Sequence, residues 1–192
     1  SLGIGCFSFY KNKIIHAEEG GCITIPTEDA QYYEDLCDLK NMSFGKHHDY
    51  IHDGIGFNYR MPESTADKVL DSLNEVRWNL NLRKTVEWSY NIHLLPEIVR
   101  PERDVVWVYD INIPNPSKFV RLMNKMGIQA RRTFAPMSRQ PIYFDRDHDL
   151  TMSNGLYEST AYLPVHPSMS LEEVLTIANL TNMYYLSQND DD

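Results

Sequence analysis

The sequence of 192 residues is short of cysteine and of basic residues. Its three cysteines are an odd number without metal-ligand spacing, which favours buried thiols in a reducing compartment over a disulfide framework. Lysine and arginine number 18 against 27 aspartate and glutamate, so the formal net charge is −9. Because no basic stripe offsets this balance, the composition argues against a nucleic-acid partner.

Long apolar runs are also lacking. No stretch approaches the roughly 20 residues of a membrane-spanning helix, and the first residues do not have the regions of a signal peptide. These absences predict a soluble, cytoplasmic protein with no membrane partner. What the sequence does contain is 42% hydrophobic and 11% aromatic residues, enough to bury one substantial core or two small ones.

The apolar pattern changes twice along the chain. Residues 3–10 and 20–26 have the composition of short strands, and the polar, glycine-punctuated residues 40–56 are typical of a long loop. From about residue 62 the apolar positions recur at helical spacing, which predicts one long helix over residues 62–95. We therefore expect a first region of residues 1–61, followed by a connecting helix.

A third region, residues 96–192, follows the linker that Pro96 and Pro101 mark. Its pattern predicts two strands and two helices, in the order strand, helix, strand, helix, at residues 104–113, 116–127, 128–136 and 170–186. Ser170 is the expected N-cap of the last helix, with Glu172 and Glu173 in its first turn. These elements predict a small α+β domain.

Lys13 lies in the turn between the first two strands, two residues after Lys11. A lysine amine forms a Schiff base with a carbonyl group or with pyridoxal phosphate, most readily where the amine is partly desolvated. Spacing alone leaves two interpretations open, a catalytic lysine or a solvated surface charge.

The stretch CFSFYKNKIIHAEEGG resembles the lysine motif of the DegT/StrS-type sugar-nucleotide aminotransferases, which are fold type I enzymes with pyridoxal 5′-phosphate. The family pattern is Ser-Phe-x-x-x-Lys followed by Glu-Gly-Gly. In this register the resemblance makes Lys13 the catalytic, cofactor-holding lysine and Lys11 a bystander, while the hydroxyl of Ser8 binds the cofactor phosphate. Where the family often has Thr-Thr-Gly after the lysine, this chain has His16, Ala17 and Glu18.

Three further stretches resemble the family's motifs in the same order. GFNYRM, residues 56–61, resembles the segment whose asparagine binds the phosphate of the neighbouring subunit's cofactor and whose arginine holds the amino donor's carboxylate, here Asn58 and Arg60. Residues 127–143 resemble a Gly-Ile-x-x-Arg stretch that ends in Gln-Pro-x-Tyr. LPVHP resembles the turn before the last helix, where His166 is expected to shape the turn or to contact substrate.

The resemblance implies an α/β fold. Residues 1–61 would then be the end of a large cofactor-binding domain with a mixed sheet, and residues 96–192 the small domain. It also implies a homodimeric aminotransferase with glutamate and a nucleoside-diphosphate keto-sugar as substrates. The family's N-terminal half is absent and the chain begins within an apolar run, so we expect a fragment that is inactive alone, its missing half lying in the same or a separate chain.

Two alternatives to the aminotransferase stay open. One is a sugar dehydratase of the same family, which uses pyridoxal phosphate but has a histidine in place of the lysine, so that Lys13 argues against it. The other is a non-catalytic remnant that acts as a folding or dimerisation module. A metal site built from His16, His47, His48 and His52 is not expected, because their spacing is irregular and the surrounding sequence is typical of a loop.

Overall fold

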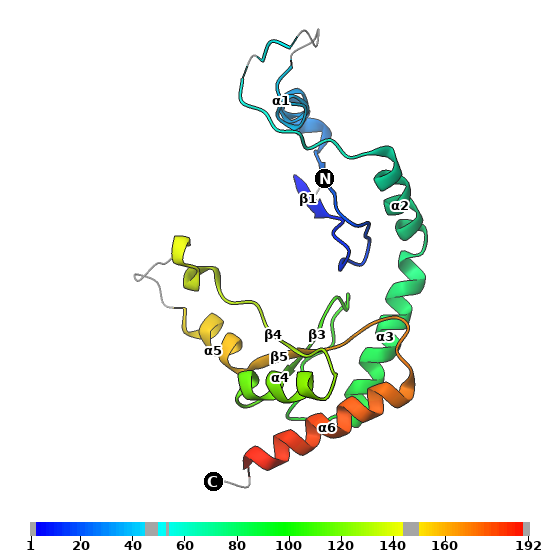
Figure 1. Cartoon of the computed structure of the whole chain (residues 1–192), viewed down its shortest axis with the longest axis vertical. Coiled ribbons are helices and arrows are strands. Elements are labelled where there is room, and N and C mark those ends of the chain that lie inside the picture. Colours follow the sequence, from blue (N-terminus) through cyan, green and yellow to red (C-terminus); the bar gives the residue numbers. More distant parts are fainter. Residues whose placement is uncertain (1–2, 45–49, 53, 144–149, 190–192) are drawn as a thin grey trace. The chain divides into compact units, whose positions relative to one another are not determined.

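The structure is a computed structural model that describes residues 3–44, 50–52, 54–143 and 150–189 (Figure 1). The chain divides into two compact units, Ser1–Arg77 and Trp78–Asp192. No helix in the described ranges has both the length and the apolar character needed to cross a membrane.

A β-hairpin, a 3-10 turn and two helices make up the described part of the first unit. Strand β1 (Gly5–Ser8) pairs antiparallel with β2 (Gly21–Thr24), so that Ser8 lies opposite Gly21. The turn η1 (Thr27–Asp29) leads into helix α1 (Gln31–Lys40), and α2 (Glu63–Asn74) ends the unit. The two strands expected at the start of the chain are therefore present and pair with each other.

The hairpin leaves its apolar side chains exposed within the described chain. Ile4, Phe7 and Ile23 keep 51%, 54% and 48% of their surface accessible. Strands with apolar side chains on both faces are typical of sheets that other strands and helices cover. The larger mixed sheet expected from the sequence stays a prediction.

The single helix expected over residues 62–95 is divided into two helices in the structure. Helix α2 ends at Asn74 and α3 (Val76–His93) begins two residues later, because Glu75 adopts φ −91° and ψ −4°, away from the regular helical values. The apolar spacing continues across this residue, so the pattern gives no sign of the break. Helix α3 belongs almost wholly to the second unit, which therefore begins well before the predicted Pro96 linker.

The second unit is built on a three-stranded antiparallel sheet. Its strands are β3 (Tyr109–Asn112), β4 (Arg131–Arg132) and β5 (Thr160–Leu163), and β5 lies between the other two. Its remaining elements are α4 (Pro116–Lys125), η2 (Met137–Arg139), η3 (Pro141–Tyr143), α5 (Thr151–Ser159) and α6 (Leu171–Asn189). The sequence analysis missed both α5 and the central strand β5.

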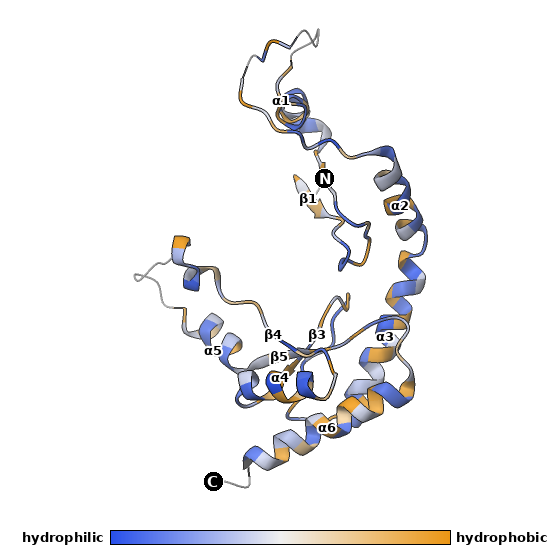
Figure 2. Cartoon of the chain, in the orientation of Figure 1, coloured by the Kyte–Doolittle hydropathy of each residue, from blue (hydrophilic) through white to orange (hydrophobic). Residues whose placement is uncertain are grey.

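The core of the second unit lies between the sheet and helices α3, α4 and α6. Its largest fully buried side chains include Tyr90, Ile111 and Phe119. Helix α6 packs beside α3, and its hydrophobic residues gather on the stretch next to that helix (Figure 2). The Asn182 amide of α6 fixes the end of α3, because it donates to His93 O at 2.8 Å and accepts from Leu95 N at 3.0 Å.

The predicted start of the last helix is confirmed. Ser170 N–H donates to Glu173 Oε2 at 2.7 Å, and Glu173 N–H donates back to Ser170 Oγ at 3.2 Å. This reciprocal pair is a capping box, which satisfies two backbone donors at a helix N-terminus. The Ser170 N–H, together with the Ser170 hydroxyl that donates to the same Glu173 Oε2 at 2.9 Å, lowers the pKa of the Glu173 carboxyl below its ordinary value.

Candidate functional site

The two lysines of the hairpin turn lie in different environments. Lys13 is half-buried, and its N–H donates to Tyr10 O at 2.8 Å. Lys11 is exposed, with its Nζ 5.8 Å from the centre of the Tyr10 ring. A lysine binds a carbonyl group most readily where its surroundings are partly desolvated, and Lys13 is the less exposed of the two residues.

Ser8 is the last residue of β1, at the end of the hairpin that leads into the Lys13 turn. Its exposed hydroxyl accepts a long hydrogen bond of 3.4 Å from Tyr10 N–H. The hydroxyl proton is then available to donate to an acceptor such as a phosphate oxygen. The structure therefore places Ser8 and Lys13 in one continuous strand-and-turn segment.

The glycine pair that ends the turn is required by close packing. Gly20 has φ +123°, a conformation that other residues rarely adopt. A Cβ atom on Gly21 would lie 2.6 Å from the carbonyl oxygen of Phe7 on the facing strand. The hairpin thus needs glycine at both positions, which gives a physical reason for the Glu-Gly-Gly part of the motif.

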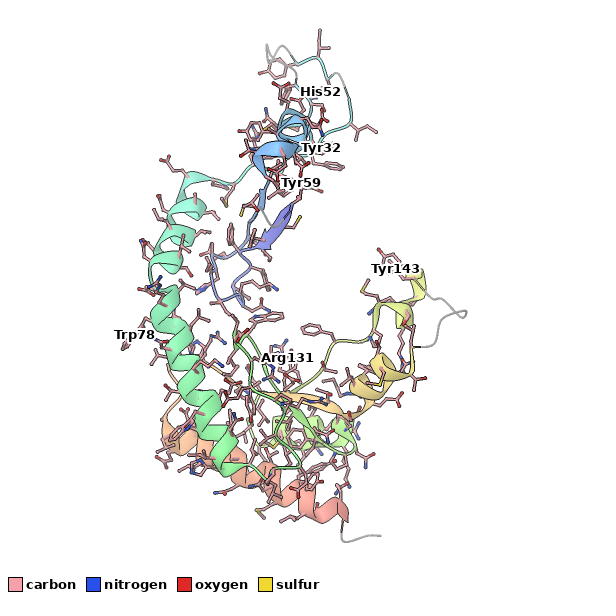
Figure 3. All side chains as sticks on the ribbon, turned by 180° about the vertical axis from the view of Figure 1, so that it is seen from behind. Tyr32, His52, Tyr59, Trp78, Arg131 and Tyr143 are labelled. Carbon is pink, nitrogen blue, oxygen red and sulfur yellow. The ribbon has the colours of Figure 1, made fainter. Side chains whose placement is uncertain are left out.

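Asn58 and Arg60 lie two residues apart in an extended segment, so their side chains lie on the same side. Arg60 Nε donates to Asn58 Oδ1 at 3.1 Å, and both residues are exposed. On the other side the rings of Phe57 and Tyr59 stack at 4.9 Å; Tyr59 is labelled in Figure 3. The structure thus brings the predicted amide and guanidinium groups together.

The segment with Asn58 and Arg60 is held against the end of α1 by backbone hydrogen bonds. Phe57 N–H donates to Leu39 O at 2.6 Å, and Met42 N–H donates to Phe57 O at 3.1 Å. A Cβ atom on Gly56 would lie 2.5 Å from backbone atoms of Met42 and Ser43. The glycine of the GFNYRM stretch therefore permits this close approach.

His166 lies in the second unit, in the turn between β5 and α6. Its Nδ1 accepts from Ser168 N–H at 3.2 Å, so the ring takes part in shaping the turn. It also lines a pocket of about 510 Å³ together with Gly127, Ile128 and Pro164. Two of the motif stretches, Gly-Ile and Leu-Pro-x-x-Pro, therefore meet at one pocket.

Helix α3 holds the turn that carries His166. The hydroxyl of Tyr90 donates to Pro164 O at 3.1 Å, and Arg83 donates to Val165 O at 2.7 Å. Burial raises the pKa of the Tyr90 phenol, so this donor keeps its proton across the physiological range.

Two histidines of the first unit, His16 and His52, lie in its described part, and they contact different segments. His52 Nδ1 contacts Met42 O at 2.6 Å, whereas His16 contacts α2. Among the residues that the structure describes, no group of three or more His, Cys, Asp or Glu side chains could hold a metal ion. His47 and His48 lie outside the described residues.

Sequence reasoning did not single out Ser72, which contacts the segment after Lys13. A serine inside an amphipathic helix carries no local signal, because its partner, His16, lies 56 residues away in the sequence. Only the fold brings the two together.

The family model of the DegT/DnrJ/EryC1/StrS aminotransferases matches residues 1–181. The chain belongs to this family. The GDP-perosamine synthase of Escherichia coli O157:H7 is 28% identical over 190 residues, which are 95% of this chain and 52% of that protein. The dTDP-3-amino-3,6-dideoxy-alpha-D-galactopyranose transaminase of Aneurinibacillus thermoaerophilus is 26% identical over 173 residues, 86% of this chain and 47% of that protein. The chain spans about half the length of the curated relatives it matches.

Solved structures of the family have the same fold. PseC of Helicobacter pylori, an aminotransferase involved in the biosynthesis of pseudoaminic acid, has a TM-score of 0.82 at 21% identity, covering 97% of this chain and 55% of that one. Spr1654 of Streptococcus pneumoniae, solved in its PMP form, has a TM-score of 0.82 at 19% identity, covering 97% of this chain and 53% of that one. The family resemblance is thereby confirmed, and with it the α/β class and the family's cofactor, pyridoxal 5′-phosphate.

Proposed function

We propose that this chain is part of an aminotransferase that moves an amino group from glutamate to a keto-sugar linked to a nucleoside diphosphate. The observation that carries the proposal is the half-buried Lys13 beside the end of β1, within a family match that runs over residues 1–181. Relatives named for GDP- and dTDP-linked sugars support the substrate class.

The side chains of the first unit have the chemistry that pyridoxal phosphate requires. The Lys13 amine suits the cofactor aldehyde, and the Ser8 hydroxyl is a donor for its phosphate, while the Asn58 amide is a donor for the phosphate of the neighbouring subunit's cofactor. When bound, the cofactor supplies a carbonyl group for the amino group and a ring that delocalises the electron pair left at the neighbouring carbon.

The residues of this chain then have distinct tasks. Lys13 Nζ would hold the cofactor in the resting site. Once the incoming amino group displaces it, the freed amine would move a proton from the carbon that bears the amino group to the other carbon, as a general base and then a general acid. The Arg60 fork binds the carboxylate of glutamate in a bidentate manner. His166, at the pocket of the second unit, contacts the sugar substrate.

The active assembly contains more than these residues. Because the chain spans about half of its relatives, we propose that a counterpart of their other half, in the same or a separate polypeptide, completes the site. Asn58 serves the phosphate of the neighbouring subunit, so the assembly is a symmetric homodimer with two shared sites.

The test compares Lys13→Ala with Lys11→Ala in the complete protein that contains this sequence. With glutamate and nucleotide-linked keto-sugars as substrates, Lys13→Ala should lose amino transfer by at least about a thousandfold, while Lys11→Ala stays within about threefold of the unaltered protein. Comparable losses in both variants would contradict the assignment. Release of water without amino transfer would instead support the dehydratase, and no turnover with any keto-sugar would support the non-catalytic module.

A further inference from the structure

The segment that follows Lys13 is attached to helix α2 by a buried serine. His16 N–H donates to Ser72 Oγ at 3.0 Å, and the same oxygen lies 3.3 Å from His16 Nδ1. Ser72 is only 8% exposed, and it is the one buried residue of α2, all of whose residues the structure describes. A helix that buries a serine rather than an apolar residue uses that position for hydrogen bonding.

A second attachment lies one helical turn earlier. Lys68 Nζ donates to Glu18 Oε1 at 2.7 Å, and this contact lowers the pKa of the Glu18 carboxyl. Lys68 and Ser72 are four residues apart, so they project from the same face of α2. The ion pair is exposed and therefore contributes less than the buried contact.

Between these two attachments the segment is also tied to Phe9, the residue that follows β1. Ala17 is 6% exposed, and its N–H donates to Phe9 O at 2.7 Å. Three consecutive residues, His16, Ala17 and Glu18, are thus held by three separate partners. They occupy the place where the family often has Thr-Thr-Gly.

We propose that Ser72 and Lys68 are positioning residues that hold the Lys13 turn through His16 and Glu18, in place of the family's usual turn. This inference rests on the proposed function for the role of Lys13. A lysine side chain has a flexible four-carbon stem, so the position of its backbone determines the range of positions that Nζ samples. Fixing the backbone three to five residues downstream narrows that range and favours the reactive geometry.

The first test needs no cofactor and follows amide hydrogen exchange in the 192-residue chain. Ser72→Ala removes the acceptor of the His16 amide, whose exchange should accelerate on the order of tenfold. Ser72→Thr keeps the hydroxyl and should stay near the unaltered rate. Ser64→Ala, an exposed serine of the same helix, is the matched control. A change below twofold in Ser72→Ala, or an equal change in Ser64→Ala, would overturn the attachment.

The second test uses the complete protein with pyridoxal phosphate. Ser72→Ala should lower kcat by about tenfold while KM for both substrates stays within about twofold, because the substrate contacts are intact. Ser72→Thr should recover the activity. A kcat within twofold of the unaltered protein, or failure of Ser72→Thr to recover it, would overturn the positioning role. Absence of cofactor on Lys13 in the unaltered protein would overturn the proposed function instead, and the exchange result would then stand by itself.

Discussion

Replacing Gly21 by alanine tests whether the hairpin sets the end of β1 for the Lys13 turn. The added Cβ would lie 2.6 Å from Phe7 O, closer than the 3.0 Å below which real Cβ atoms are essentially never found. Because the contact is to backbone rather than to a flexible side chain, one strand has to move. The movement falls on Ser8, the residue paired with Gly21.

The expected size of the effect follows from two opposing terms. Overpacking of this kind costs about 1–3 kcal/mol, and the stiffer unfolded chain returns about 0.4–1 kcal/mol. The net change lowers the free energy of opening the hairpin by about 0.5–2 kcal/mol, which raises the population of its open form roughly 2- to 30-fold. Gly155 of α5 is the control, because a Cβ there meets nothing within 4 Å and alanine favours a helix by about 1 kcal/mol.

Amide hydrogen exchange of β1 and β2 is the assay. Gly21→Ala should accelerate exchange in both strands by the stated factor, whereas Gly155→Ala should slow exchange within α5. In the complete protein, Gly21→Ala should also weaken retention of pyridoxal phosphate. Unchanged exchange of the hairpin in Gly21→Ala would refute the packing argument, and faster exchange of α5 in Gly155→Ala would show that glycine replacement itself is harmful.

Three further predictions concern other parts of the chain. Glu87→Ala removes a buried carboxylate that pairs with a lysine and an arginine, and should lower the free energy of unfolding in urea by about 2–3 kcal/mol. Ser170→Ala removes the cap of α6 and should cost about 1 kcal/mol. Because Ser170 lowers the pKa of Glu173, the ionised Glu173 carboxylate stabilises the folded chain. This stabilisation is complete above the ordinary pKa of 4.5 and is lost as the pH falls through the lowered pKa. The free energy of unfolding should therefore fall less on acidification in Ser170→Ala. Mixing Asn58→Ala with Lys13→Ala subunits should regenerate one intact site per heterodimer, and heterodimers without activity would exclude the shared site.

Elements with local signals were predictable from the sequence. The hairpin strands, α4 and α6 follow from apolar pattern and turn residues, and the capping box at Ser170 is encoded within four residues.

Elements that depend on tertiary contacts were not predictable. Strand β5 has only four residues and three of them are buried, so it lacks the alternation by which half-buried strands are recognised. The Glu75 break leaves the apolar spacing intact, and so the second unit appeared to begin at the prolines rather than at Trp78. The role of Ser72 depends on His16, which only the fold brings near.

Reductive trapping tests the central claim most directly. The complete protein is loaded with pyridoxal phosphate and reduced with borohydride, and its peptides are mapped by mass spectrometry. The proposed function predicts a pyridoxyl group on Lys13 and none on Lys11. A pyridoxyl group on Lys11 alone, or a fully loaded protein whose label lies outside the hairpin turn, would contradict the account.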